Sequence, residues 1–228
     1  MLKKDSSVWS TAVSSRGGGP PFVGSNCFIK MIQSGAVIVA AGSAFNIVVT
    51  QGGGVWAMGR NYLGQLGDGT TVRKGMFSFI QKIPGAFDVS AGSGHTLVRT
   101  QGGDVWATGW NKYGQLGDVM PYSYIIRFRV AVISWAKAMA TGDAHSLVIT
   151  DDRCLRAAGW NHNGQLGDGS RIDRRQFVQV MSGGAVKVAA GACYSIVLKQ
   201  DQSVWATGCN GYGQLGDCLL YTSDAADE

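Results

Sequence analysis

Two histidines, four aspartates and one glycine-rich run are the residues of this chain whose types and spacing suit chemistry. His95 and His145 carry imidazoles, which are common zinc ligands. Carboxylates can work in pairs as a general acid and a general base. The four aspartates that recur at regular spacing are Asp68, Asp118, Asp168 and Asp217. Residues 211–216 read Gly-Tyr-Gly-Gln-Leu-Gly and satisfy the dinucleotide-binding pattern Gly-x-Gly-x-x-Gly.

All four aspartates close the same pentapeptide, Gly-Gln-Leu-Gly-Asp, which we call the box. Its copies are Gly64, Gln65, Leu66, Gly67 and Asp68; Gly114, Gln115, Leu116, Gly117 and Asp118; Gly164, Gln165, Leu166, Gly167 and Asp168; and Gly213, Gln214, Leu215, Gly216 and Asp217. A motif that recurs at a period of about 50 residues indicates a chain built from copies of one supersecondary unit.

The repeat favours structural roles for these candidates. A carboxylate present once per unit is expected to accept hydrogen bonds from its own loop, whereas a catalytic pair needs unequal placement around one bond. His95 and His145 share a repeat position with Phe45 and Tyr194, so we expect packing between units and no shared metal ion. The glycine run has no helix pattern after it, which dinucleotide binding requires. The sequence predicts no catalytic residue, no cofactor and no metal site, and therefore no enzyme.

The elements that hold these residues read as short strands. Residues 186–191, 194–198 and 204–208 alternate apolar with small or polar side chains, and glycines in Thr50–Val55 and Thr100–Val105 suit tight hairpins. No stretch keeps a helical apolar period. Each unit is therefore predicted to hold about four strands and a loop, without a helix, as in the blades of a β-propeller.

Further signatures surround each box. Val-Trp pairs occur at Trp56, Trp106 and Trp205, and an asparagine opens each box loop at Asn61, Asn111, Asn161 and Asn210. In this combination the chain resembles the regulator of chromosome condensation repeat family. The resemblance implies an all-β, seven-bladed propeller, of which this chain would form an incomplete arc of roughly four to five blades. Family members serve as guanine-nucleotide exchange factors, as modules in ubiquitin ligases and as protein-binding or inhibitor domains.

Three segments follow from the repeat pattern. Residues 1–27 are expected to be a partial first repeat that is degenerate or disturbed by a reading-frame error, and residues 28–217 to be the propeller repeats. Residues 218–228 leave the pattern and resemble a translated sequencing adapter, so we expect them not to be native. One copy departs locally, with Leu155-Arg156 in place of Val-Trp.

Composition and cysteine spacing bear on the fold class and on the cellular compartment. The chain has a formal net charge of +5 and 34 glycines without a three-residue period, which suits turn-rich β structure. The longest apolar stretch, residues 35–42, is too short to cross a membrane. Cysteines at 27, 154, 193 and 209 show no paired spacing, so we expect free thiols in a reducing compartment, the cytoplasm or nucleus.

Individual residues in the loops are the candidates for binding, because the copies differ there. The candidate partner-binding residues are Trp110, Lys112, Tyr113, Trp160, His162, Arg171, Arg174 and Arg175. Trp, Tyr and Arg anchor many interfaces, although simple packing of Trp110 and Trp160 remains open. The sequence predicts a non-catalytic protein-interaction module, with nucleotide exchange on a small GTPase as the alternative. The partner is expected to be a protein, such as a small GTPase or an acidic surface, rather than nucleic acid.

Overall fold

The computed structural model describes residues 1–10, 29–118, 123–130 and 133–216. It is almost entirely β, with one short 3-10 turn, η1 (Gln51–Gly53), in the described part. The strands are β1 (Val8–Ser10), β2 (Ile29–Ile32), β3 (Ala36–Ala41), β4 (Phe45–Thr50), β5 (Gly54–Gly59), β6 (Lys74–Lys82), β7 (Ala86–Ala91), β8 (His95–Thr100), β9 (Val105–Trp110), β10 (Tyr124–Val130), β11 (Ala136–Thr141), β12 (His145–Thr150), β13 (Leu155–Gly159), β14 (Arg174–Met181), β15 (Ala185–Ala190), β16 (Tyr194–Lys199) and β17 (Val204–Gly208).

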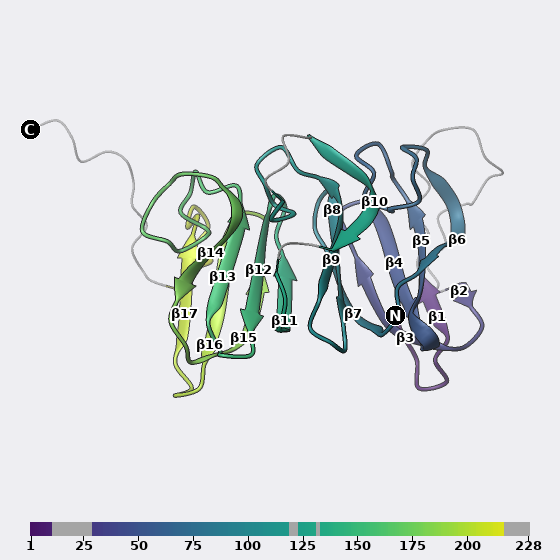
Figure 1. The fold of residues 1–228 in the computed structure, drawn as a ribbon, viewed down its shortest axis with the longest axis horizontal. Coiled ribbons are helices and arrows are strands. Elements are labelled where there is room, and N and C mark those ends of the chain that lie inside the picture. The colour runs from purple at the N-terminus through teal and green to yellow at the C-terminus, as the bar shows by residue number, and fades with distance from the viewer. Residues whose placement is uncertain (11–28, 119–122, 131–132, 217–228) are drawn as a thin grey trace, which may run out of the picture.

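Neighbouring strands pair antiparallel into sheets that follow chain order. Blade 1 is β3–β6, blade 2 is β7–β10, blade 3 is β11–β14, and blade 4 is the three-stranded β15–β17. The pair β1–β2 forms a further half-sheet. Figure 1 shows the sheets side by side along the long axis, with β1–β2 and β15–β17 at opposite ends. The expected all-β architecture, an incomplete arc of four-stranded propeller blades, is confirmed.

Each blade buries one apolar face against the next blade. Strands β4 and β5 of blade 1 contribute fully buried side chains such as Ile47 and Val55. Val89, Val98 and Trp106 of blade 2 pack against them. The tryptophan of the Val-Trp pair is therefore a plug between sheets. Burial of such a face stabilises by about 25 cal/mol per Å² of apolar surface, so the contact between blades is the main favourable term.

Blade 4 presents the equivalent face uncovered within the described part of the chain. Val55 in blade 1 is 0% exposed, whereas its counterpart in blade 4, Val204, is 66% exposed. Exposed apolar faces and open strand edges promote association, because both gain by being covered.

The asparagine that opens a box loop holds that loop from the inside. The buried Asn61 accepts a hydrogen bond from the Leu66 N–H through Oδ1, at 3.0 Å. Its Nδ2 donates to Asp68 Oδ1 at 3.0 Å and to the carbonyl of Val72 at 3.1 Å. Asn161 makes the same set of contacts with Leu166, Asp168 and Ile172. The buried amide thus supplies hydrogen-bond partners to backbone N–H and C=O groups of the loop that have no backbone partner.

Hydroxyl groups of each blade then capture carbonyls of the preceding box. Thr96 Oγ1 donates to the Gln65 carbonyl at 2.8 Å, and Ser146 and Ser195 donate to the equivalent carbonyls of Gln115 and Gln165 at 2.7 Å each. The glutamine side chains stay within their own loop, where Gln65 Oε1 accepts from the Leu63 N–H. The loop is thus tied to its neighbour through its backbone carbonyl and not through the glutamine side chain.

The box glycines leave room for the outer strand of the next blade. Gly117 has φ +73°, and a Cβ there would lie 2.3 Å from the Phe177 ring on β14. At the equivalent Gly167, φ is +75° and the nearest atom would be Thr207 Cγ2 at 3.2 Å. Both positions require the left-handed conformation, but only Gly117 also lies against an aromatic ring.

We therefore expect Gly117→Ala to destabilise the protein more than Gly167→Ala. Left-handed strain costs each alanine about 1–2 kcal/mol, and overpacking against Phe177 adds about 1–3 kcal/mol at position 117 alone. Urea unfolding of the two variants measures the difference. Equal losses would show that blade 3 does not pack on this box as described.

Candidate functional site

The two histidines lie between blades, where their side chains are buried and hydrogen-bonded. His95 and His145 are both 0% exposed. His95 Nε2 lies 2.9 Å from Ser146 Oγ, and His145 Nε2 lies 3.0 Å from Ser195 Oγ. Since each serine donates its proton to a box carbonyl, its oxygen accepts from the imidazole, which places the histidine proton on Nε2. The structural role expected for both residues matches this geometry.

Burial keeps both imidazoles neutral. Desolvation lowers the pKa of His95 to about 3, with the nearby His145 adding to the effect, and lowers the pKa of His145 to about 4. Among the described residues, no group of three or more His, Cys, Asp and Glu side chains is placed to hold a metal ion.

The box aspartates act as local acceptors. Asp168 Oδ1 accepts from the Ser170 N–H at 3.0 Å, and Arg174 Nε donates to Oδ2 at 2.6 Å. Partial burial opposes ionisation of Asp168, but hydrogen bonds from Arg174, Ser170 and Asn161 outweigh it and lower its pKa to about 2. Asp68 is held in the same way by Thr70 and Lys74. Asp217 lies outside the described residues, and residues 211–216 form turns.

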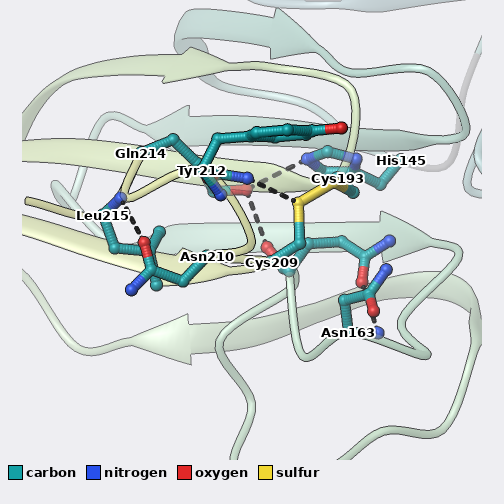
Figure 2. The surroundings of a disulfide bond; sticks show 10 residues. His145, Asn163, Cys193, Cys209, Asn210, Tyr212, Gln214 and Leu215 are labelled. Atoms are coloured by element: carbon teal, nitrogen blue, oxygen red, sulfur yellow. Dashed lines mark hydrogen bonds between the residues drawn. A yellow bond between two sulfur atoms is a disulfide. The ribbon is translucent and has the colours of Figure 1, made fainter. Parts of the chain in front are cut away.

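The expectation of free thiols is wrong for two cysteines. Cys193 and Cys209 form a disulfide, with Cα atoms 5.6 Å apart. They stand just before β16 and just after β17, where Tyr194 pairs with Gly208, so the antiparallel register brings them together despite their sequence separation of 16. Figure 2 shows Asn163 of the preceding box loop beside this disulfide. Aligning the repeats would have revealed the pair, because both positions flank one ladder. The expectation of a reducing compartment rested on free thiols, so this disulfide removes its support.

Residues at the end of the third strand and in the box loop of blades 2 and 3 form a continuous aromatic ridge, consisting of Trp110, Tyr113, Trp160 and His162. Trp110 and Tyr113 pack edge to face with ring centroids 5.3 Å apart. Tyr113 reaches across to Trp160 at 6.2 Å, and Trp160 lies 5.8 Å from His162. The first three side chains are half-buried and His162 is exposed. The structure thus brings together residues that the sequence had named separately.

The basic candidates divide into two groups. Arg174 is occupied by Asp168 and serves the loop, so its assignment as a free binding residue is not supported by its contacts. Lys112 is exposed with its ammonium group over the Tyr113 ring, at 5.4 Å from the centroid. Arg175, at the start of β14, is exposed and donates to the Lys112 carbonyl at 3.3 Å, and Arg171 is exposed in the loop that precedes β14. The ridge is therefore bordered by positive charge.

No helix in the described ranges is long and apolar enough to span a membrane.

Trp135 has a positive φ that the sequence pattern did not lead us to predict. The signal was present in the repeat, because the matching position holds glycine in the other three blades.

Replacing both buried histidines by Phe is expected to reduce the acid sensitivity of the fold. Phe45 already occupies this position in blade 1, where it packs over Gly42 as His95 packs over Gly92. The folded-state pKa values of about 3 and 4 lie below the ordinary value of 6.5, so stability is complete above pH 6.5 and is lost as pH falls toward them.

Each histidine steepens that loss by up to about 1.4 kcal/mol per pH unit. The free energies of unfolding measured in urea at about pH 7 and about pH 5 should therefore lie closer together in His95→Phe/His145→Phe than in the wild-type chain. The pKa values of Asp68 and Asp168 are lowered from the ordinary aspartate value of 3.8, so these carboxylates lose their contribution to stability only at pH values outside this window. An unchanged difference between the two pH values in the double variant would contradict burial of neutral imidazoles.

Solved structures share this arrangement of blades. Human WBSCR16 matches with a TM-score of 0.76 and 24% identity over 93% of this chain and 58% of its own. Yeast RCC1 (Prp20), in its structure bound to Kap60, matches with a TM-score of 0.66 and 22% identity over 76% of this chain and 42% of its own. Prp20p from Saccharomyces cerevisiae, in a structure whose study concerns binding to Gsp1p and histones, matches with a TM-score of 0.64 and 24% identity over 76% of this chain and 43% of its own.

The chain thus spans between 42% and 58% of the length of these structures, and the likeness shows the fold. None of the curated protein sequences matches the chain. Family models of the regulator of chromosome condensation (RCC1) repeat match residues 36–65, 88–115, 136–165 and 185–214, and a second model of the same repeat matches 52–99. These matches cover more than half of the chain, and the chain belongs to the regulator of chromosome condensation (RCC1) repeat family.

Proposed function

We propose that this chain is a non-catalytic protein-interaction module that binds an acidic protein surface through the aromatic ridge and its basic border. The observation that carries the proposal is the ridge itself. Half-exposed aromatic side chains from two blades form one continuous surface at the end of the sheets where the box loops lie. Aromatic residues of this kind contribute most of the binding energy in many interfaces, because they bury a large area with few rotamers.

The charges around the ridge support an acidic partner. Lys112, Arg171 and Arg175 are exposed on this side. Asp143 is an exposed acidic side chain in the adjacent loop, and Asp173 lies 3.8 Å from His162. The border is net positive, which attracts carboxylates and speeds encounter with an acidic surface.

Catalysis by side chains finds no support at this surface. Asp168 and Asp173, on the loop that carries Trp160 and His162, are engaged with Arg174 and with the Asn161 N–H. The buried histidines are neutral and lie between blades, out of reach of a substrate. A general acid or base must lie within hydrogen-bonding reach of its substrate, which these groups do not.

Substitution of Trp160 by Ala should weaken binding of a labelled oligoglutamate peptide with interspersed phenylalanines by about tenfold or more, since truncation of an interface tryptophan commonly costs more than 1 kcal/mol. Fluorescence anisotropy at two salt concentrations measures the affinity. Lys112→Gln/Arg175→Gln should weaken binding and flatten its salt dependence.

The matched control is Lys82→Gln/Arg129→Gln. It removes the same charge from exposed residues that lie toward the strand ends away from the box loops, where Lys82 pairs with Gly54 and Arg129 with Ala107. Binding that falls equally in both double variants would show non-specific attraction to a basic chain and would refute the ridge as the site.

Nucleotide exchange on a small GTPase is the alternative, favoured by the fold shared with the yeast RCC1 structure studied for binding to Gsp1p. The repeat spacing leaves no blade with an inserted wedge, so we expect no change in the rate at which small GTPases release a fluorescent guanine nucleotide. Acceleration that rises with protein concentration would replace the interaction-module proposal with the exchange-factor one.

A further inference from the structure

Blade 4 has an apolar sheet face that the described part of the chain leaves uncovered. In blade 1 the residues of the same face are at most 2% exposed, because blade 2 covers them. In blade 4 every counterpart is half-buried or exposed. We call these residues of blade 4 the open face; they are Tyr194, Ile196, Leu198, Val204, Ala206 and Leu215. A contiguous apolar surface of this kind marks an interaction site.

The last strand of blade 4, β17, is also an open edge. The third strands β5, β9 and β13 each pair with a fourth strand, whereas blade 4 has three strands among the described residues. Trp205 on β17 is 56% exposed, whereas its counterpart Trp56 packs edge to face on Phe79 of the fourth strand β6, with ring centroids 5.5 Å apart. An occupant of this end must therefore cover the open face and supply a strand beside β17.

The N-terminal hairpin duplicates the hairpin that leads into β17. Residues 2–9 and 198–205 differ at only two positions. Their internal contacts also agree. In each hairpin the serine hydroxyl donates to the aspartate two residues earlier, and the tryptophan Nε1 donates to that serine. A lysine ammonium group lies over each indole. A surface that accepts β1 is therefore chemically suited to β17.

The position of β1 shows where such a hairpin docks. Val8, the counterpart of Val204, is only 3% exposed, because it packs against Ala36 and Val48 of blade 1. The Ser6 carbonyl accepts from the Ala36 N–H at 3.0 Å, and the same bond joins blade 3 to blade 4. Strand β2 pairs with β1 with a register shift directly after the valine, as β6 does with β5. Thus β1 stands where a preceding blade has its third strand, and β2 where it has its fourth.

The single strand β1 covers the face of blade 1 incompletely. Asn46 occupies the repeat position of Thr96 and Ser146, which are 0% exposed under the preceding blade. Asn46 itself is half-buried, and a small cavity lined by Val8, Val39 and Asn46, among others, remains beside β1. A three-stranded sheet in the same place would bring a second strand over this cavity, so it would bury more apolar surface than β1 does.

We propose that the open face of blade 4 binds blade 1 of a second copy of this chain and displaces β1 there. Strand β2 of the second copy then pairs with β17 and completes blade 4 as its fourth strand. Val204 takes over the contacts of Val8. The Asn46 amide donates to the Gln214 carbonyl, which is the bond that a hydroxyl makes to the preceding box in the other blades.

Each copy carries both halves of this junction. Figure 1 shows β1–β2 and β15–β17 at opposite ends of the molecule. Two copies can therefore bind head to tail through two identical junctions, in a ring of eight blades, within the range of about four to eight that β-propellers use. The junction involves blades 1 and 4, whereas the aromatic ridge lies on blades 2 and 3, so this proposal and the proposed function fail independently.

Sedimentation velocity of the full chain over a range of concentrations tests the junction. The wild-type chain should form a dimer as its concentration rises. Val204→Asp should weaken dimerisation at least about tenfold, because the junction would bury an unpaired carboxylate. Val204 is 66% exposed on the single copy, so the variant should keep its fold, which circular dichroism checks.

The matched control is Val186→Asp, which adds the same charge to β15 of the same blade. Val186 is 44% exposed, and its counterpart Val37 stays 42% exposed although blade 2 covers blade 1. Position 186 therefore lies outside the junction, and this variant should dimerise as the wild-type chain does.

Hydrogen exchange distinguishes displacement of β1 from simple stacking of two copies. On dimerisation the amides of β17 should exchange more slowly, because β2 becomes their partner. The amides of residues 2–9 should exchange faster, because β1 loses its contacts with β2 and blade 1. Neither change should occur in Val204→Asp.

Four results would overturn the proposal. The first two are a chain that stays monomeric at every concentration and dimerisation that falls equally in Val204→Asp and Val186→Asp. The third is slower exchange of residues 2–9 on association, which would mean that the second copy stacks on β1 instead of displacing it. The fourth is an assembly that grows beyond the dimer, because two junctions would then not close a ring.

Discussion

The capture of a box carbonyl by a hydroxyl of the following blade is the interaction on which the arc depends. A propeller blade is a small sheet that cannot bury its own apolar face, so its stability comes from its neighbours. Area burial alone would let two sheets slide or rotate. The hydrogen bonds from Thr96, Ser146 and Ser195 to glutamine carbonyls fix the position of each blade against the previous one. They work only if the box backbone is rigid, which is the role of the buried asparagine at Asn61 and Asn161.

This arrangement explains why residues that suit chemistry perform none at these positions. The imidazoles of His95 and His145 extend the same polar contact between blades, and desolvation keeps them neutral. Asp68 and Asp168 satisfy the N–H groups of their own turns and pair with Lys74 and Arg174. Pairing stabilises polar groups in a dry interface, since an unpaired one costs more than a typical hydrogen bond gains. The pairing is incomplete here, because the Nδ1 atoms of His95 and His145 are buried without a partner among the described residues.

Function in such a repeat is expected where copies differ. The position at the end of the third strand is Arg60, Trp110, Trp160 and Cys209 in successive blades. The backbone geometry is the same in each, with an N–H bound to the carbonyl of the preceding loop. The fold therefore tolerates a basic, an aromatic or a disulfide-bonded side chain there. The aromatic ridge lies where this freedom is used, in blades 2 and 3.

The sequence by itself determined the family, the all-β blades and the structural role of the box, because each is a local pattern repeated at a fixed period. Fourfold recurrence of Asn and Gly-Gln-Leu-Gly-Asp is enough to separate a structural position from a site. Tertiary structure alone decided what depends on neighbours across blades. It joined Tyr113 to Trp160, bonded Cys193 to Cys209 through strand register, assigned Arg174 to Asp168, and showed that the loop is tied to its neighbour by the Gln65 carbonyl rather than its side chain. A single chain position does not reveal these contacts, because they form only when sheets stack at a particular angle and register.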